Sequence, residues 1–338
     1  MIVVMKPGAS RREVKSVIKQ IERLGFKAHP IFGVKRTVIG AIGDDRDKHL
    51  LQSLSGLPWV EQLVPILQPF KLASKEIKKE PTVIKVGKAV FGGRYFGVIA
   101  GPCTVETEKQ MMETALYVAR SGAKMLRGGA FKPRTSPYSF QGLEERGLKL
   151  LARASQKTGL PFVTEVLNPE DVSLVAEYAD VLQVGARNAQ NFALLRRVGK
   201  SGKPVLLKRG PAMTVQEFLM SAEYILSEGC HQVLLCERGI RTFETATRYT
   251  LDISCIPVVR QYSHLPVIVD PSHAAGHRQY VTALSLAALA AGADGLMVEV
   301  HPDPARAVCD GQQALTPDDF SSLMRNLRTM ADALKRRL

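Results

Sequence analysis

Eight short apolar segments of this chain each end in or beside a polar or charged residue, and stretches of helical character separate them. They are Phe96–Cys103, Met125–Phe131, Pro161–Val166, Val181–Arg187, Pro204–Gly210, Val233–Gly239, Pro266–His273 and Gly295–His301. Short, continuously apolar runs are typical of strands that are buried on both faces. A strand–helix unit that occurs eight times predicts an α/β fold, a closed (β/α)8 barrel of the TIM type.

The ends of these segments carry the chemistry of the chain. The end residues are Cys103, Arg127, Glu165, Arg187, Lys208, Arg238, His273 and Glu299. In a parallel barrel all strands point the same way, so their C-terminal ends meet at one mouth. The sequence therefore predicts one pocket that holds a thiol, an imidazole, carboxylates and several cations.

The N-terminal part of the chain lies outside this barrel, because the chain has 338 residues and a barrel needs about 250. Residues 1–68 follow a β-α-β-β-α-β order, which predicts a ferredoxin-like domain. The predicted elements are strand Ile2–Met5, helix Arg11–Leu24, strands Lys27–Ile31 and Arg36–Ile42, helix Lys48–Leu54 and strand Val60–Ile66. Nothing in this segment suggests catalysis, and a small-ligand or docking domain and an oligomerisation domain both stay open.

Residues 69–92 are predicted to connect the two domains. Their first half is rich in lysine, which is typical of a linker, and Thr82–Val86 with Lys88–Phe91 predicts a hairpin around Gly87. We expect this hairpin to close the N-terminal end of the barrel, which would occupy residues 93–338.

Composition limits the class of protein. No run is long and apolar enough to span a membrane, and no signal-peptide pattern follows Met1, so we expect a cytoplasmic protein without a membrane partner. The five cysteines are odd in number and include no Cys-x-x-Cys pair, which argues against a disulfide framework and excludes a zinc-ribbon spacing.

The net charge of +14 allows two interpretations. A basic surface can bind nucleic acid. Here the basic residues recur at strand ends instead of following one helix, so we expect no nucleic-acid partner. A basic pocket for anionic small molecules explains their placement better.

Four of the residues at or beyond strand ends form a mixed sulfur, nitrogen and oxygen donor set. They are Cys103, His273, Glu299 and Asp310. Such a set suits a divalent ion such as Mn²⁺, Fe²⁺ or Zn²⁺. No local motif announces the site, and each residue alone has a structural explanation. The first, seventh and eighth strands are neighbours in a closed barrel, however, so the four side chains can converge.

The loop after the second strand is a candidate anion site. The segment Arg127-Gly128-Gly129-Ala130-Phe131-Lys132-Pro133-Arg134-Thr135-Ser136-Pro137 holds three cations and two hydroxyls. Its glycines let the backbone approach a ligand closely, and guanidinium groups bind phosphate or carboxylate in a bidentate manner. An ordinary basic surface loop is the alternative.

Three further cations, Arg187, Lys208 and Arg238, each follow an apolar strand. A cation that faces the inside of a barrel is costly unless a ligand or a carboxylate compensates it, so the trio suggests a polyanionic substrate. Lys208 could alternatively be a Schiff-base nucleophile with a desolvated amine. Asp270 and Glu165 are candidates to orient water or a substrate hydroxyl, although Asp270 alone is also a common turn residue.

Together these motifs resemble the metal-dependent class I 3-deoxy-D-arabino-heptulosonate 7-phosphate (DAHP) synthases, in the subgroup with an N-terminal ferredoxin-like regulatory domain. The matching segments are Gly101–Glu106, Leu126–Pro137, Gly185–Asn188, Leu207–Gly210, Asp270–His273 and Val298–Pro302. The resemblance implies a condensation of phosphoenolpyruvate with erythrose 4-phosphate and water, the first step of the shikimate pathway.

The resemblance also implies roles for single residues. It implies that phosphoenolpyruvate contacts Arg127, Lys132, Arg187, Lys208 and Arg238. It implies that erythrose 4-phosphate contacts Arg134, Thr135, Ser136 and Asp270. It implies a divalent metal ion (Mn, Fe, Zn, Co or similar) on Cys103, His273, Glu299 and Asp310, with Lys132, Glu165 and Asp270 as catalytic residues.

Two expectations concern the acceptor and the regulation. The related 3-deoxy-D-manno-octulosonate 8-phosphate synthases use arabinose 5-phosphate and carry a Lys-Ala-Asn-Arg run where this chain has Lys132-Pro133-Arg134-Thr135. That loop favours the four-carbon acceptor and leaves the five-carbon one as the alternative. The N-terminal domain implies inhibition by tyrosine or phenylalanine, and family members of this type imply a homotetramer.

Overall fold

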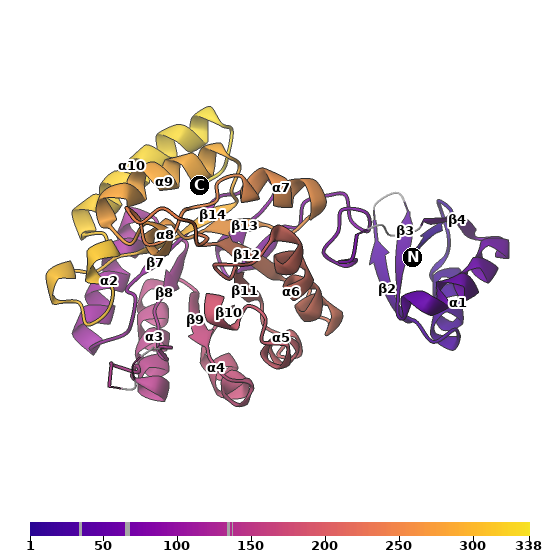
Figure 1. Cartoon of the computed structure of the whole chain (residues 1–338), viewed down its shortest axis with the longest axis horizontal. Coiled ribbons are helices and arrows are strands. Elements are labelled where there is room, and N and C mark those ends of the chain that lie inside the picture. Colours follow the sequence, from indigo (N-terminus) through magenta and orange to yellow (C-terminus); the bar gives the residue numbers. More distant parts are fainter. Residues whose placement is uncertain (34–35, 65–67, 134–135, 137) are drawn as a thin grey trace. The chain divides into compact units, whose positions relative to one another are not determined.

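The computed structural model describes residues 1–338 except 34–35, 65–67, 134–135 and 137. The chain forms two compact units (Figure 1), which are described separately. One unit comprises Met1–Glu80 with Tyr262–His264, and the other comprises Pro81–Gln261 with Leu265–Leu338. No helix of the described part of the chain has the length and apolar character that a membrane span requires.

The first unit is the ferredoxin-like domain that the sequence predicts. Its elements are β1 (Ile2–Met5), α1 (Arg11–Arg23), β2 (Lys27–Phe32), β3 (Thr37–Ile42), the 3-10 helix η1 (Asp45–Gly56) and β4 (Val60–Val64). The strands form an antiparallel sheet in the order β2-β3-β1-β4. The second predicted helix, Lys48–Leu54, lies within the longer 3-10 helix η1. The first helix, α1, begins at a capping box between Ser10 and Glu13.

The core of this unit is apolar. Val3 and Met5 of β1 pack with Val17 and Ile21 of α1 and with Ile39 of β3. The buried side of α1 repeats at helical spacing, which is why the sequence pattern predicted it.

The second unit is a closed, eight-stranded parallel barrel. Its strands are β7 (Gly97–Gly101), β8 (Met125–Arg127), β9 (Phe162–Val166), β10 (Val181–Val184), β11 (Val205–Lys208), β12 (Val233–Glu237), β13 (Val267–Val269) and β14 (Gly295–Glu299). Each strand pairs with the next in the chain, and β14 pairs with β7 to close the ring. The predicted barrel is confirmed.

Helices connect the strands and surround the barrel (Figure 1). The α-helices are α2 (Glu108–Ser121), α3 (Glu144–Thr158), α4 (Val172–Tyr178), α5 (Phe192–Gly199), α6 (Val215–Ser227), α7 (Cys255–Tyr262), α8 (Pro271–Ala275), α9 (Arg278–Ala290) and α10 (Pro317–Ala333). Short 3-10 helices are η2 (Pro169–Asp171), η3 (Ala186–Asn188), η4 (Pro304–Arg306) and η5 (Gly311–Gln313).

A hairpin of β5 (Ile84–Val86) and β6 (Ala89–Phe91) belongs to the barrel core. Its apolar side chains form one buried cluster with inward-facing residues of the strands, among them Ile99, Met125 and Leu234. The ring of Phe91 occupies space that a side chain at Gly97 would fill, because a Cβ there would lie 2.4 Å from its Cε1 atom. A glycine at the start of β7 is therefore required for this packing.

The strands are shorter than the apolar segments of the sequence, mainly at their C-terminal ends. β7 ends two residues before Cys103, and Arg187 lies in η3 instead of in a strand. His273 lies in α8, which begins at Pro271 with Asp270 as its N-cap. Past every strand except β9 the apolar pattern continues because the first loop residues are buried too, so burial alone could not mark those strand ends.

Candidate active site

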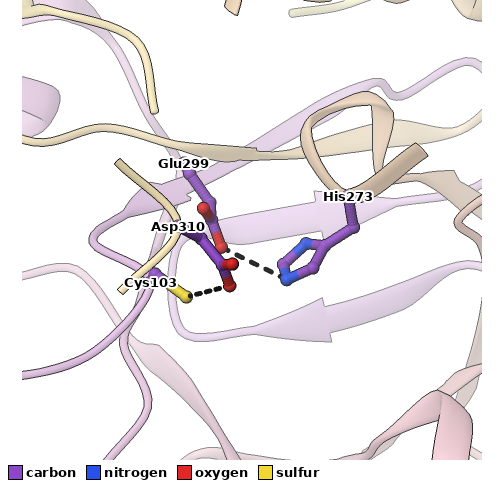
Figure 2. Close-up of side chains that lie close together, drawn as sticks. All are labelled: Cys103, His273, Glu299 and Asp310. Atoms are coloured by element: carbon purple, nitrogen blue, oxygen red, sulfur yellow. Dashed lines mark hydrogen bonds and ion pairs between the residues drawn. The ribbon is translucent and has the colours of Figure 1, made fainter. Parts of the chain in front are cut away.

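The four predicted metal ligands converge at the C-terminal end of the barrel (Figure 2). Cys103 follows β7, His273 lies in α8 after β13, Glu299 ends β14, and Asp310 precedes η5. One ligand atom from each lies within 4.8 Å of the others. Closure of the barrel between β14 and β7 makes this possible, because it joins the two ends of the barrel sequence.

The contacts within this cluster orient its ligand atoms. Cys103 Sγ lies 3.2 Å from Asp310 Oδ2, and His273 Nε2 lies 3.3 Å from Glu299 Oε1. His273 Nδ1 lies 2.8 Å from Asp270 Oδ2. A carboxylate there accepts a hydrogen bond from Nδ1–H, which leaves Nε2 as the ligand atom facing the cluster.

The donor set fits a divalent ion. Among the described residues, Glu299 Oε1 is a buried carboxylate oxygen without a hydrogen bond, although it lies 3.1 Å from Arg127. An unsatisfied buried oxygen is costly, and a cation among these four residues would satisfy it. Thiolate, imidazole and carboxylate together suit Mn²⁺, Fe²⁺, Co²⁺ or Zn²⁺.

The protonation states follow from burial and from neighbouring charges. Burial raises the pKa of Cys103 well above its usual value, and Glu299 raises it further. Burial lowers the pKa of His273 to about 4. Burial acts to raise the pKa of Glu299, but nearby His273 and Arg127 outweigh it and lower that pKa. Burial acts to raise the pKa of Asp310 as well, but nearby Arg248 outweighs it and lowers that pKa. At neutral pH only the thiol must therefore lose a proton to bind a metal ion.

Cations surround the cluster and are paired with its carboxylates. Arg127 contacts Glu299 and donates to the carbonyl oxygen of Cys103 at 3.4 Å. Lys132 Nζ lies 3.1 Å from Cys103 Sγ. Lys208 Nζ lies 2.5 Å from Asp270 Oδ2. A carboxylate holds this amine, so the geometry favours an electrostatic role for Lys208 over that of a Schiff-base nucleophile.

A cavity of about 360 Å³ opens beside the cluster. Its walls include predicted site residues from the ends of seven strands or the segments that follow them: Lys132, Ser136, Glu165, Arg187, Lys208, Arg238, His273 and Asp310. Arg127 lines a smaller adjoining pocket together with Cys103, Lys132 and Glu165. The structure thus brings the five predicted phosphoenolpyruvate-binding cations together, whereas Arg134 and Thr135 lie outside the described residues.

Glu165 and Asp270 have different surroundings. Glu165 faces the cavity and accepts a hydrogen bond from Gln183 at 2.9 Å. Asp270 is fully buried, caps α8, and binds both His273 and Lys208. The structure places Asp270 behind His273, where it holds the imidazole and the amine in position, and its contact with an aldehyde substrate stays a prediction.

The sequence analysis missed four polar residues at the site. Arg248 and Tyr249 line the cavity from the long loop after β12, and Arg248 lies 3.4 Å from Asp310. Gln313 donates to Glu299 Oε2 at 2.8 Å, and Gln183 binds Glu165. Two features of the sequence could have pointed to these residues. They are the length and polarity of the loop after β12 and the polar residue three positions beyond Asp310.

Comparison with known proteins agrees with this geometry. Residues 77–336 match the family model described as the DAHP synthetase I family, and residues 1–68 match the one described as the DAHP synthase ferredoxin-like domain. The phospho-2-dehydro-3-deoxyheptonate aldolase of Thermotoga maritima is 53% identical over 334 residues, which covers 99% of this chain and 98% of the relative.

Solved structures and a second group of relatives complete the comparison. The crystal structure of the Thermotoga maritima DAHP synthase superposes with a TM-score of 0.80, at 52% identity, covering 99% of this chain and 98% of that chain. A truncated form of that enzyme gives a TM-score of 0.75 at 51% identity, covering 79% of this chain and 98% of its own. The 2-dehydro-3-deoxyphosphooctonate aldolase of Syntrophotalea carbinolica is 33% identical over 274 residues, 75% of this chain and 98% of the relative.

Proposed function

The chain belongs to the DAHP synthetase I family, and we propose that it condenses phosphoenolpyruvate with erythrose 4-phosphate and water to give DAHP and inorganic phosphate. One observation carries the proposal: a cluster suited to a divalent metal ion lies on the wall of a cavity that cations line. Two phosphorylated reactants repel each other, and fixed positive charge at one cavity offsets that repulsion.

Cys103, His273, Glu299 and Asp310 are the residues that would hold the metal ion. When bound, a divalent ion at this position supplies Lewis-acid polarisation of the aldehyde oxygen. The physiological ion is one of Mn, Fe, Zn, Co or a similar metal. Asp270 supports the site by fixing His273, and Gln313 does so by binding Glu299.

The cations bind phosphoenolpyruvate at the cavity. Arg127, Lys132, Arg187, Lys208 and Arg238 surround its carboxylate and phosphate. Guanidinium groups suit both groups because their paired N–H donors match two oxygens at once. Ser136 lines the same cavity and, with Arg134 and Thr135 of the same loop, is assigned to the phosphate of erythrose 4-phosphate.

The reaction needs one proton donor and one proton acceptor. C3 of phosphoenolpyruvate forms a bond to the aldehyde carbon, and the aldehyde oxygen takes the displaced electron pair and a proton from Lys132. Water adds to C2 and loses a proton to Glu165, which faces the cavity. The C2–O bond to phosphate then breaks, and phosphate leaves with the bonding pair and takes the remaining hydroxyl proton as HPO4²⁻, so that C2 becomes a ketone. The proton that Glu165 accepts balances the one that Lys132 gives.

A phosphate-release assay tests the proposal. The enzyme is offered phosphoenolpyruvate with erythrose 4-phosphate or with arabinose 5-phosphate, with and without a chelator. We expect phosphate release with the four-carbon aldehyde and its loss after chelation. Faster release with arabinose 5-phosphate would establish the alternative acceptor, and a borohydride-trapped adduct on Lys208 would establish a Schiff-base aldolase. Salt-sensitive nucleic-acid binding without phosphate release would contradict enzymatic function.

The remaining assignments concern regulation and context. The ferredoxin-like domain supports inhibition by tyrosine or phenylalanine, so removal of residues 1–68 is expected to preserve activity and abolish inhibition. Inhibition that survives removal would contradict a regulatory role. We also assign a homotetramer, to be checked by light scattering, and a cytoplasmic location, where Cys103 stays reduced.

A further inference from the structure

A second buried charge cluster lies behind the cationic wall of the cavity. It consists of Arg209, Glu237 and Asp252, which are not among the residues that line the cavity. Arg209 NH1 lies 2.9 Å from Glu237 Oε2 and 2.8 Å from Asp252 Oδ2. The side chains of Arg209 and Glu237 are 5% and 0% exposed, so the ion pairs are shielded from water. Charges this deeply buried are costly to retain, which calls for an explanation of their presence.

The position of the cluster follows from strand geometry. Arg209 comes directly after Lys208 at the end of β11, and Glu237 comes directly before Arg238 at the end of β12. Side chains alternate between the two faces of a strand. Lys208 and Arg238 face the cavity, whereas Arg209 and Glu237 lie on the opposite face of the barrel wall. Each strand end thus presents one charge to the ligand and one to the supporting structure.

Glu237 holds both ends of the loop that follows β12. Its Oε1 atom accepts hydrogen bonds from the backbone N–H of Gly239 at 2.6 Å and of Asp252 at 3.4 Å. Between these points, Ile240 and Thr250 exchange two backbone hydrogen bonds. The loop is therefore closed at its base by one carboxylate, while its tip, including Phe243, is exposed.

Arg209 joins this loop to the preceding one. Its Nε atom donates to the carbonyl oxygen of Met213 at 3.0 Å, in the loop between β11 and α6. The N–H of Arg241 donates to the carbonyl oxygen of Pro211 at 2.8 Å. The loops after β11 and β12 are consequently fixed to each other at the mouth of the barrel.

The loop after β12 positions a residue of the cavity wall. Tyr249 lies near its end, and the Cζ atom of Arg238 lies 4.3 Å from the centre of the Tyr249 ring. Both residues line the cavity. Gly239 allows the close approach, since its φ is +94° and a Cβ there would lie 2.6 Å from Tyr249 Cβ. The direction of the Arg238 guanidinium therefore depends on where the loop places Tyr249.

We propose that Arg209, Glu237 and Asp252 are positioning residues that fix the loop after β12, so that Tyr249 holds Arg238 toward the anionic groups of phosphoenolpyruvate. This inference rests on the proposed function, because it assumes that phosphoenolpyruvate is the ligand of Arg238. It adds residues with no substrate contact to the determinants of phosphoenolpyruvate affinity.

The direction in which a charge-neutralising substitution changes phosphoenolpyruvate affinity tests the inference. Glu237→Gln and Asp252→Asn each remove a negative charge near an anion site, so simple electrostatics predicts tighter phosphoenolpyruvate binding. Positioning predicts the opposite, and we expect the KM for phosphoenolpyruvate to rise about 10-fold or more, because displaced ligand groups lose their geometry. The KM for erythrose 4-phosphate and the bound metal content should change less than about 3-fold.

Variants of Tyr249 and of the loop tip are the controls. Tyr249→Leu removes the ring that lies against Arg238 and should raise the KM for phosphoenolpyruvate. Phe243→Ala, at a 98% exposed position of the same loop, should change nothing. If Glu237→Gln does not fold, Asp252→Asn and Tyr249→Leu decide the question.

Two failures are distinguishable in the full-length, metal-loaded enzyme. Wild-type enzyme that releases no phosphate from phosphoenolpyruvate would overturn the proposed function. Normal wild-type turnover, with unchanged or tighter phosphoenolpyruvate binding in Glu237→Gln and Asp252→Asn by titration calorimetry, would overturn this inference alone. An equal rise in both KM values would also overturn it, because it would indicate general structural damage.

Discussion

The two ends of the barrel are made by the same eight strands, yet they bury opposite kinds of side chains. At the N-terminal end, the hairpin β5–β6 and the inward-facing strand residues form an apolar cluster that includes Phe91 and Met297. At the C-terminal end, Arg127, Lys208 and Glu299 are buried charges. Apolar burial stabilises a fold directly, whereas buried charges need partners and contribute little net stability. The comparison indicates that one end maintains the fold and the other serves chemistry.

The charged end is tolerated because its charges compensate one another. Arg127 pairs with Glu299, and Asp270 pairs with both Lys208 and His273. Removing one member leaves its partner buried and unpaired. Substitutions at the two ends should therefore fail in different ways, and four experiments test this from the largest expected effect to the smallest.

Cys103→Ser should abolish function without unfolding the protein. The substitution replaces the thiolate ligand with a weak oxygen donor, so metal affinity falls and activity drops about 1000-fold or more, the scale of a lost Lewis acid. Metal content, initial rates and circular dichroism are the measurements. Full activity of this variant after chelator treatment would refute the metal role of Cys103.

Phe91→Ala should damage the fold and spare the chemistry. The ring is fully buried at the apolar end, and its removal leaves a cavity that costs about 3–5 kcal/mol of unfolding free energy. Denaturant unfolding measures the loss, and kcat and both KM values should be unchanged below the transition. Val83→Ala, at a 50% exposed position before the hairpin, is the matched control. A fall in kcat without a loss of stability would contradict the division between the two ends.

Asp270→Asn should weaken metal binding through His273. The variant keeps the size of the side chain but removes the charge that holds the imidazole and Lys208, so we expect metal affinity to fall about 10–100-fold. Competition with a chromogenic chelator measures it, and Asp332→Asn on the exposed part of α10 is the control. Unchanged metal affinity together with a higher KM for the aldehyde would instead restore the predicted substrate contact of Asp270.

Metal affinity should rise about tenfold per pH unit between pH 6.5 and 8, because binding releases one proton. Burial raises the pKa of Cys103, so the thiol is protonated in the metal-free protein, while the pKa values of Glu299 and Asp310 are lowered and both are already ionised. Nearby Lys132 has a raised pKa and stays charged throughout. Calorimetry in buffers of different ionisation enthalpy counts the protons. Cys103→Ser should show no slope, and a slope in that variant would assign the proton to another group.

Much of the site was predictable because it follows from the fold. Residues at strand C-termini of a parallel barrel face one mouth, and this placed Glu299 and Lys208 correctly at the rim. The residue types alone left it undecided whether the four candidates bind a metal ion or have structural roles. The resemblance to a family favoured the metal site. Barrel closure made their convergence an expectation from the sequence, and the structure placed one ligand atom of each within 4.8 Å of the others.

Other features left little trace in the sequence. Arg248 reaches the cluster from a loop and Gln313 from the short 3-10 helix η5, and neither segment has a periodicity to interpret. Arg209 and Glu237 belong to the same motifs as Lys208 and Arg238, but the strand ends had to be located before alternation could assign them to the opposite face.

The sequence by itself determined the number of strand–helix units, the two-domain order and the residues that occupy the rim. These depend on apolar patterning along the chain, which is a local property. Only the tertiary structure decided which charge meets which, as in the pairing of Lys208 with Asp270 and of Arg209 with Glu237 and Asp252. Those choices depend on barrel closure and on loop paths, which bring distant residues within the few ångströms over which ion pairs and metal ligation act.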